Sequence, residues 1–405
     1  MQPTPSEETE KRKLGHRYLL SPTFILAMTI FIDATGFGMI IPLLPFYAES
    51  LQAGSTALGI LIASFSVMQF VFSPVLGKIS DKAGRKPILL LSILTSMASF
   101  GLFVLADSFL LLLISRLVAG LATETAVAQA YIADVTSKKD RAGGIGKVGA
   151  AHGAGFIVGP AIGGFLSVYG FSAAGIAAII LTSINFLFVL FLLPESLTKE
   201  RQESQSITKS NKSILRQIRN AFSKGLIGLV LTIFFIVFLS FSAIPVIVPL
   251  LGVAYFGIGP VEMSYLFVYI GLVQIILQGF VIGRLVAKTG DLKLITFGPL
   301  IMMAGILFMP LFPNIGIFIV SLTMIASGSG IMRTVVPSFI SKATAESEQG
   351  GILGVTNSVA SIATVPGPLI GGFLFEFAGL ASPFFVSALL LLFSLILGFG
   401  ALRKA

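Results

Sequence analysis

The sequence predicts an all-α membrane protein with twelve transmembrane helices in two pseudo-symmetric six-helix bundles. The 405 residues are 55% hydrophobic and only 11% charged, with a mean hydropathy of +0.97. A soluble domain carries about 25% charged residues, so a soluble chain this apolar would lack a polar surface. Twelve apolar segments follow one another, each with the roughly 20 residues that a spanning helix needs. Finally, short motifs of the first half recur in the second half.

The apolar segments are separated by short polar turns and by one long polar stretch. The first twenty residues are polar and precede no short apolar core with a cleavage site, so we expect a tail and not a signal peptide. We predict a tail (1–21), a first bundle (22–193), a linker (194–224) and a second bundle (225–405). The predicted spans are 22–48, 56–77, 87–106, 108–133, 144–168, 172–193, 226–252, 262–283, 292–311, 314–341, 350–375 and 381–401.

Lysine and arginine predict the orientation. Of the 27 basic residues, Arg116 and Arg333 lie inside spans, and the others lie in or beside the tail, the even-numbered loops and the C-terminal Arg403-Lys404. Cytoplasmic loops carry the excess of Lys and Arg. We therefore expect a multi-pass protein of the cell membrane with both termini in the cytoplasm. Basic loops facing anionic lipid explain the net charge of +9, so no nucleic-acid partner is expected.

Four motifs recur at offsets of 206 to 208 residues, which indicates a six-plus-six duplication. Chance similarity among glycine-rich helices is the alternative. An even number of spans per half makes the repeats parallel, and transporters of this build bind substrate near the midplane, between the halves. The recurring pairs are Pro42-Leu43-Leu44 with Pro249-Leu250-Leu251, Gly77 and Gly84 with Gly283 and Gly290, residues 143–145 with 350–352, and residues 159–164 with 367–372.

Two acids lie inside spans. Asp33 is about 16 Å into the first span, near the bilayer centre, and Glu124 is near the middle of the fourth. Because a carboxylate is costly there, each is a candidate for proton exchange or substrate contact. The alternative for Asp33 is a structural hydrogen bond, and the alternative for Glu124 is a salt bridge with Arg116 or Arg333. Arg116 lies two helical turns from Glu124, too far for an i, i+4 pair.

The remaining polar residues of the spans are few. His152, about two turns into the fifth span, titrates near neutral pH and could relay protons, or it could simply pack in a Gly/Ala-rich helix. Arg333 could snorkel to the surface or close an ion pair between the halves. An otherwise apolar substrate cavity is expected to contain Asp33, Glu124 and Arg333 together with Gln69, Gln129, Gln274, Gln278 and Asn357.

The most polar short run of the first half is Gly77–Pro87, which we predict to be a loop at a membrane surface. Asp81 and Arg85 are four residues apart and suited to pairing if the run is helical. A carboxylate is also stabilised at a helix N-terminus. In the second copy Ala287 stands in place of Asp81 and Asp291 in place of Arg85. This asymmetry predicts that only the first copy has a role beyond marking topology, with Asp81 as its working residue.

The fifth span carries small residues at four-residue spacing, which lets helix backbones approach closely. Pro160 removes one backbone donor and can bend the helix. The residues of this motif are Gly155, Gly159, Pro160, Gly163 and Gly164.

Together these motifs resemble those of the major facilitator superfamily. The run Gly77–Pro87 resembles motif A, Arg116-x-x-x-Gly120 resembles motif B, and Gly155–Gly164 resembles motif C of the antiporter branch. Glu124 departs from the common motif B pattern. Twelve-helix drug–proton antiporters, and tetracycline exporters in particular, are similar at Phe31–Gly38, Ile41–Pro45 and Ala130–Asp134.

The resemblance implies a role for each motif. Motif C would act as a hinge or seal that limits proton leak. Motif B would place Arg116 in support of proton transfer at a nearby acid, which the resemblance does not identify. The residues expected to take part in proton coupling are Asp33, Glu124, Arg116 and His152. In motif A, Asp81 would meet the start of span 11 near Gly350-Gly351 and hold the halves in one conformation. The latch residues are Gly77, Asp81, Gly84 and Arg85, which Asp134 and Arg141 could join.

The predicted function is proton-coupled export of an amphipathic, drug-like molecule by alternating access. A metabolite, sugar or lipid transporter on the same fold is the first alternative, and a non-transporting membrane receptor or scaffold is the second. The sequence has no cysteine, and no nucleophile–base or metal-ligand constellation stands out, so we expect neither an enzyme nor a metal or cofactor. The expected partners are a small-molecule substrate, protons and the lipid bilayer, with the chain acting as a monomer.

Overall fold

The computed structural model describes residues 21–136, 141–197, 214–344 and 349–404. This part of the chain is nearly all helical and contains twelve spans long and apolar enough to cross a membrane, as predicted. The spans are Pro22–Ser50, Ser55–Ala83, Arg85–Val104, Phe109–Val135, Gly143–Ser167, Phe171–Leu192, Gly225–Phe256, Pro260–Thr289, Asp291–Leu311, Ile315–Lys342, Gly351–Phe377 and Ser382–Arg403.

Seven of these spans are single helices within the described residues, and a short amphipathic helix, α11 (Ile214–Phe222), precedes the seventh span. The single helices are α4 (Ser55–Ala83), α5 (Arg85–Val104), α8 (Arg141–Ser167), α9 (Phe171–Leu192), α16 (Asp291–Leu311), α17 (Ile315–Lys342) and α20 (Ser382–Lys404).

The other five spans are interrupted. Prolines explain three of the interruptions, because proline lacks a backbone donor and disfavours helix at the residue before it. The interrupted spans are α2 (Pro22–Ile40), η1 (Ile41–Leu43) and α3 (Leu44–Ser50); α6 (Phe109–Leu121) and α7 (Glu124–Val135); α12 (Gly225–Ser242) and α13 (Ile244–Phe256); α14 (Pro260–Ile276), the π-helical η2 (Leu277–Val281) and α15 (Ile282–Thr289); and α18 (Gln349–Ala363) and α19 (Pro366–Phe377).

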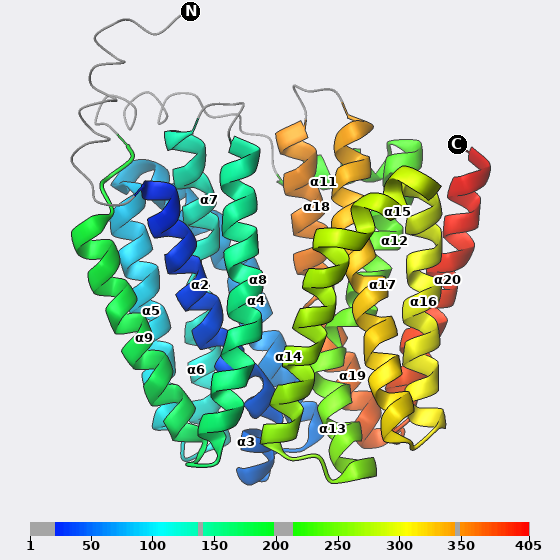
Figure 1. Cartoon of the computed structure of the whole chain (residues 1–405), viewed down its shortest axis with the longest axis horizontal. Helices are drawn as coiled ribbons and strands as arrows, with labels where there is room; N and C mark the ends of the chain where they lie inside the picture. The colour runs from blue at the N-terminus through cyan, green and yellow to red at the C-terminus, as the bar shows by residue number, and fades with distance from the viewer. Residues whose placement is uncertain (1–20, 137–140, 198–213, 345–348, 405) are drawn as a thin grey trace, which may run out of the picture.

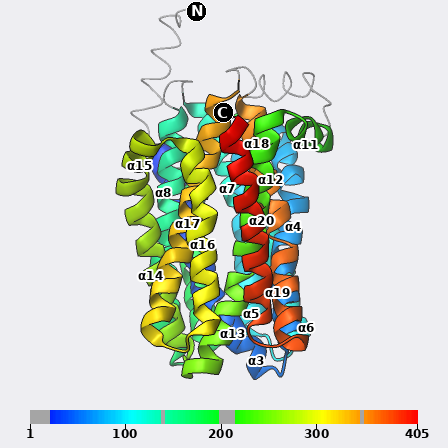
Figure 2. The ribbon, with the colours of Figure 1, turned by 90° about the vertical axis from the view of Figure 1, so that its right-hand side faces the viewer.

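The helices form two bundles that stand side by side, α2 to α9 in one and α11 to α20 in the other (Figure 1). Within the second bundle, α14 to α17 lie on one side and α18 to α20 on the other (Figure 2). Helix α2 begins and α20 ends at the same end of the molecule (Figure 1), as an even number of spans requires.

The two ends differ in charge. We call the end where α2 begins the basic end, because among the described residues it carries every Lys and Arg except Arg116 and Arg333. We call the other end the acidic end. The charged residues that the structure describes there are all acids, namely Glu49, Asp107, Glu262 and Glu376.

The two bundles touch along α4 and α19 and along α8 and α14. A Cβ on Gly59, in the second turn of α4, would clash with the backbone carbonyl of Pro368 in α19. A Cβ on Gly164, near the end of α8, would likewise clash with Ser264 of α14. These close approaches all lie in the part of each helix nearer the acidic end, so the bundles are held together there.

The repeated glycine–proline motif supplies part of this contact from each side. Gly164 of the first copy faces Ser264 in the second bundle, and its repeat partner Gly372 faces Ser55 and Gly59 in the first bundle. Small residues let helix backbones approach closely. The duplication seen in the sequence therefore reappears as two related contacts between the bundles.

The other glycines of the motif pack α8 against α2 inside the first bundle. A Cβ on Gly155 would lie 2.6 Å from the carbonyl oxygen of Phe31, and a Cβ on Gly159 or Gly163 would also meet α2 backbone. Helix α8 stays continuous through Pro160. Any larger side chain at these three glycines would push the two helices apart.

The predicted loop over Gly77–Pro87 is wrong in its form. Helix α4 continues to Ala83, and only Gly84 interrupts the run before α5 begins at Arg85. Gly84 has φ +103°, a backbone conformation that glycine adopts without steric cost. Its repeat partner Gly290 has φ +84° and joins α15 to α16 in the same way. Both copies are thus sharp helix junctions.

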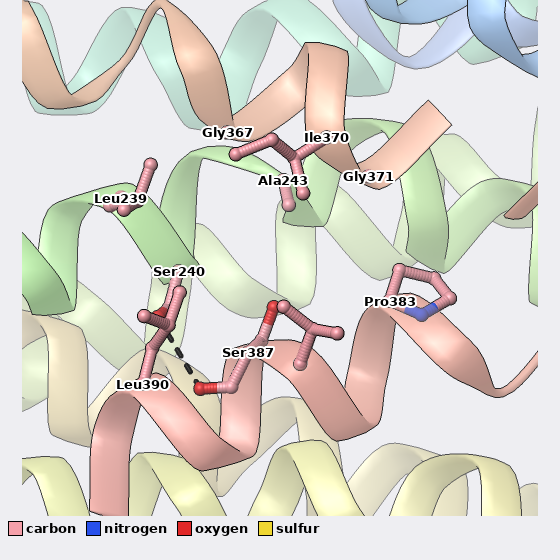
Figure 3. Close-up of a pocket in the computed structure, with 10 residues that line it drawn as sticks. Leu239, Ser240, Ala243, Gly367, Ile370, Gly371, Pro383, Ser387 and Leu390 are labelled. Carbon is pink, nitrogen blue, oxygen red and sulfur yellow. Dashed lines mark hydrogen bonds between the residues drawn. The ribbon is translucent and has the colours of Figure 1, made fainter. Parts of the chain in front are cut away.

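A small pocket inside the second bundle lies among α12, α19 and α20 (Figure 3). Ser240 Oγ donates a hydrogen bond of 3.4 Å to the carbonyl of Ser387 across it. Leu239, Ala243, Gly367 and other apolar groups line the rest. Since it lies within one bundle, this pocket is not a site between the two bundles.

Candidate functional site

Asp33 lies on α2, about three turns from the start of the helix, and is half-buried. It is close enough to Glu124 for the two carboxyl groups to interact electrostatically. The structure therefore brings together the two acids that the sequence singled out in the spans. The described residues include no basic group within ion-pair distance of either acid.

Glu124 begins α7, and its position corrects the prediction of an unbroken fourth span. Helix α6 ends at Leu121, and Thr123 has φ −136°, which breaks the span just before Glu124. The Glu124 side chain is only 3% exposed. Ser96 Oγ of α5 donates a 2.7 Å hydrogen bond to Glu124 Oε1. A carboxylate in the first turn of a helix is also favoured by the helix dipole.

Arg116 is 1% exposed and does not pair with Glu124. Its Nε donates to Ser115 Oγ at 3.3 Å, and its guanidinium carbon lies 5.6 Å from the centre of the Phe103 ring. Within the described residues its Nη1 and Nη2 have no hydrogen-bond partner. Ion pairs that would make Glu124 purely structural, with Arg116 or Arg333, are thus not found among these residues.

His152 on α8 belongs to an aromatic group that joins three helices of the first bundle. Its ring centre lies 4.9 Å from that of Phe156. Phe156 lies 5.8 Å from Phe37 of α2, and Phe37 lies 4.6 Å from Phe65 of α4. These half-buried rings form an apolar surface beside the single histidine of the spans.

Arg333 is exposed on α17 in the second bundle. Its guanidinium carbon lies 5.3 Å from the centre of the Phe238 ring of α12. It is also close enough to His152, in the first bundle, for an electrostatic interaction. Arg333 therefore lies between the bundles. Among the described residues it does not form the ion pair between the halves that the sequence allowed as one alternative.

The sparse polar residues of the spans come from both bundles. Gln69, Gln129, Gln278 and Asn357 are exposed, and Gln274 is half-buried. Gln278 lies in the π-helical segment η2 and packs beside Gly330 of α17. Such π-helical turns are frequent at functional sites. That these glutamine and asparagine side chains line a substrate cavity remains a prediction.

The charged cluster at the α4–α5 junction is built around Arg85. Arg85 Nη1 lies 2.6 Å from Asp81 Oδ1, and Arg85 Nε donates to Asp134 Oδ2 at 2.9 Å. Ser80 Oγ accepts a further hydrogen bond from Arg85. The predicted pairing of Asp81 with Arg85 is present, although it bridges a helix junction and not one continuous helix.

The second bundle has a related pair with the charges exchanged. Lys342 Nζ, at the end of α17, lies 2.9 Å from Asp291 Oδ2 at the start of α16. Asp291 occupies the repeat position of Arg85, and Lys342 the repeat position of Asp134, at offsets of 206 and 208 residues. In both bundles one ion pair thus joins the start of the third span to the end of the fourth.

The predicted contact of Asp81 with span 11 is absent from the hydrogen bonds and ion pairs of the described residues. Asp81 is instead paired with Arg85. Arg141 begins α8, but its side chain lies outside the described residues. A latching role of these residues therefore stays a prediction.

Glu195 and Glu376, two acids for which the sequence predicts no role, bind backbone N–H groups at helix starts. Glu195, after the sixth span, accepts hydrogen bonds from the backbone N of Arg85 at 2.9 Å and of Lys86 at 3.0 Å. Glu376, at the end of α19, accepts one from Thr56 N at the start of α4, at 2.7 Å. The second bond crosses between the bundles. Nothing in local spacing signals either partner, because the bonded residues are far apart in the chain.

Sequence similarity to known transporters extends over most of the chain. A family model described as Major Facilitator Superfamily matches residues 26–305 and 230–404. The tetracycline resistance protein, class E, of Escherichia coli is 31% identical over 362 residues, covering 88% of this chain and 89% of that protein. The multidrug resistance protein 2 of Bacillus subtilis is 27% identical, covering 87% and 88%. The predicted resemblance is confirmed.

Solved structures share the fold. A nucleoside transporter superposes with a TM-score of 0.73 at 13% identity, covering 95% of this chain and 99% of that one. A human organic anion transporter superposes with a TM-score of 0.68 at 22% identity, covering 93% and 98%. Since the family model matches nearly the whole chain and a relative with 31% identity covers most of it, this chain is a membrane transporter of the major facilitator superfamily.

Proposed function

We propose that this chain exports amphipathic, drug-like molecules in exchange for protons, by alternating access. The observation that carries the proposal is the pair of span acids, Asp33 and Glu124, which lie near each other without a basic partner among the described residues. An acid inside the membrane that no cation neutralises is suited to bind a proton or a cationic substrate. The similarity to tetracycline and multidrug resistance proteins supports the substrate class.

The two acids differ in access, which suggests different roles. Asp33 is half-buried, so it can exchange a proton for the cationic group of a substrate. Glu124 is almost fully buried and held by Ser96, so it can keep a proton while the bundles move. A proton entering the cell gains about 2.3 kcal/mol per 100 mV of membrane potential. That free energy would drive export.

We place the basic end in the cytoplasm of the cell membrane, because Lys and Arg accumulate in cytoplasmic loops. The bundles contact each other nearer the acidic end. On this orientation the substrate path is closed to the outside and reached from the cytoplasm. Alternating access would then move the bundles, 22–193 and 225–405, as two units joined by the linker 194–224.

The test is transport by purified protein in proteoliposomes with and without an imposed pH gradient. Asp33→Asn and Glu124→Gln remove one charge each with little change in size, and we expect each to lower gradient-driven drug flux at least about tenfold. Asp107→Asn, at an exposed acid of the acidic end, is the matched control and should transport normally. Full activity of both span variants would contradict the assignment of the proton site.

A further inference from the structure

Arg333 is a cation of the membrane spans without an acidic partner among the described residues. It lies nine residues before Lys342, the last residue of α17, which is about 14 Å along the helix axis. An arginine side chain is shorter than that distance, so snorkelling to the basic end does not account for its position. Residues next to it on α17 are buried, namely Met332, Val335 and Val336.

The guanidinium of Arg333 has neighbours in both bundles. Its carbon lies 5.3 Å from the centre of the Phe238 ring of α12, within the range of a cation–π interaction. His152 of the first bundle is close enough to it for an electrostatic interaction. One turn earlier on α17, Gly330 packs beside the amide of Gln278. Arg333 thus has an aromatic ring and an imidazole as neighbours and no described carboxylate within ion-pair distance.

The charges of the spans are divided between the two bundles. Asp33 and Glu124 belong to the first bundle, and Arg333 belongs to the second. The acids that the structure describes in the second bundle, Glu262, Asp291 and Glu376, stand at helix ends. Apart from the buried Arg116, the charged groups at mid-span in the described residues are therefore acidic in the first bundle and basic in the second.

We propose that Arg333 binds an anionic group of the transported molecule, a carboxylate above all, while Asp33 of the first bundle takes its cationic group. Arginine presents a planar fork of donors that matches a carboxylate with two parallel hydrogen bonds. The proposal deepens the proposed function, on which it rests, by naming zwitterionic amphiphiles as the preferred substrates. A purely cationic drug would leave Arg333 unpaired in the complex.

The test compares two fluorescent probes that share one chromophore, a cationic rhodamine methyl ester and its zwitterionic free acid. Binding of each probe to the purified full chain is measured by fluorescence anisotropy. We expect Arg333→Gln to weaken binding of the free acid at least about tenfold, the scale of a lost hydrogen bond to a charged group. Binding of the ester should change less than about threefold, which also shows that the variant is folded.

Two further variants sharpen the comparison. Arg333→Lys keeps the charge but not the fork, so it should recover part of the free-acid binding. Arg284→Gln makes the same change at an exposed arginine of the basic end and should leave both probes unaffected. Equal effects of Arg333→Gln on the two probes, no effect on either, or no binding of the free acid to the unaltered protein would each overturn the proposal.

Gradient-driven flux of the ester separates this proposal from the proposed function. If a pH gradient drives ester flux but Arg333→Gln does not change free-acid binding, exchange with protons stands and the anion site is refuted. If no gradient-driven flux occurs while free-acid binding depends on Arg333, the anion site stands and proton exchange is refuted.

Discussion

The bond between Glu376 and Thr56 predicts that changing Glu376 opens the acidic end. Glu376 Oε2 accepts from the backbone N of Thr56 at 2.7 Å and so ties the end of α19 to the start of α4. A hydrogen bond to a charged group contributes about 1.5–3 kcal/mol. Because Glu376 is exposed, solvent screening reduces this to roughly 1 kcal/mol. Glu376→Ala should therefore raise the population open at the acidic end about fivefold.

The natural absence of cysteine makes this population measurable. Cysteines introduced at Gln52 and Leu380, both exposed at the acidic end, give two spin labels on opposite bundles. A second pair at Lys82 and Lys288, exposed at the basic end, reports the other side. In pulsed electron resonance of the reconstituted protein, Glu376→Ala should lengthen the first distance and shorten the second.

A conservative variant of Glu376 tests whether the hydrogen bond to Thr56 causes the shift. Glu376→Gln keeps an oxygen that can accept from Thr56 N and removes only the charge, so its shift should be smaller than that of Glu376→Ala. Identical distance distributions in the unaltered protein and in Glu376→Ala would refute the reasoning. A shift in the first label pair without the reciprocal shift in the second would mean that the variant disturbs local structure and not the equilibrium between the two open states.

Two further predictions concern contacts at the two ends. Gly59→Ala places a Cβ against the carbonyl of Pro368. It should therefore lower the thermal unfolding temperature in detergent and shift the spin-label distances as Glu376→Ala does. Gly101→Ala, whose Cβ meets open space, is the control. Asp81→Asn should impair transport without changing membrane insertion or stability, because Arg85 keeps its other partners; unchanged transport would reduce the motif to a topology signal.

The fold was predictable because the membrane restricts what a chain can do. Backbone polar groups in lipid must be satisfied within the segment, so a long apolar run becomes a helix. The run 56–77 accordingly lies within α4, which extends it to Ala83. The helical part of the polar run at Lys78–Ala83 was missed for a related reason. Helix can continue into water, where hydropathy no longer marks its end, and only the conformation of Gly84 stops it.

The site was predictable in its residues and not in its geometry. Charge inside an apolar span is visible in the sequence, so Asp33, Glu124 and Arg333 could be chosen at once. The break at Thr123 and the bond from Ser96 depend on how α5 packs against the fourth span. The bond between Glu376 and Thr56 joins residues 320 positions apart, which no local pattern encodes.

Both bundles have an ion pair between the same two helix ends, whereas only the first bundle also has an acid at the position of Asp81. Arg85 with Asp134 and Asp291 with Lys342 join the same helix ends with opposite polarity. The attraction of an ion pair does not depend on which side carries which sign, so either arrangement clamps its bundle. Asp81 has no acidic counterpart in the second copy, and its side chain is 45% exposed. The clamp does not require it, which leaves Asp81 free to serve a function that only the first bundle has.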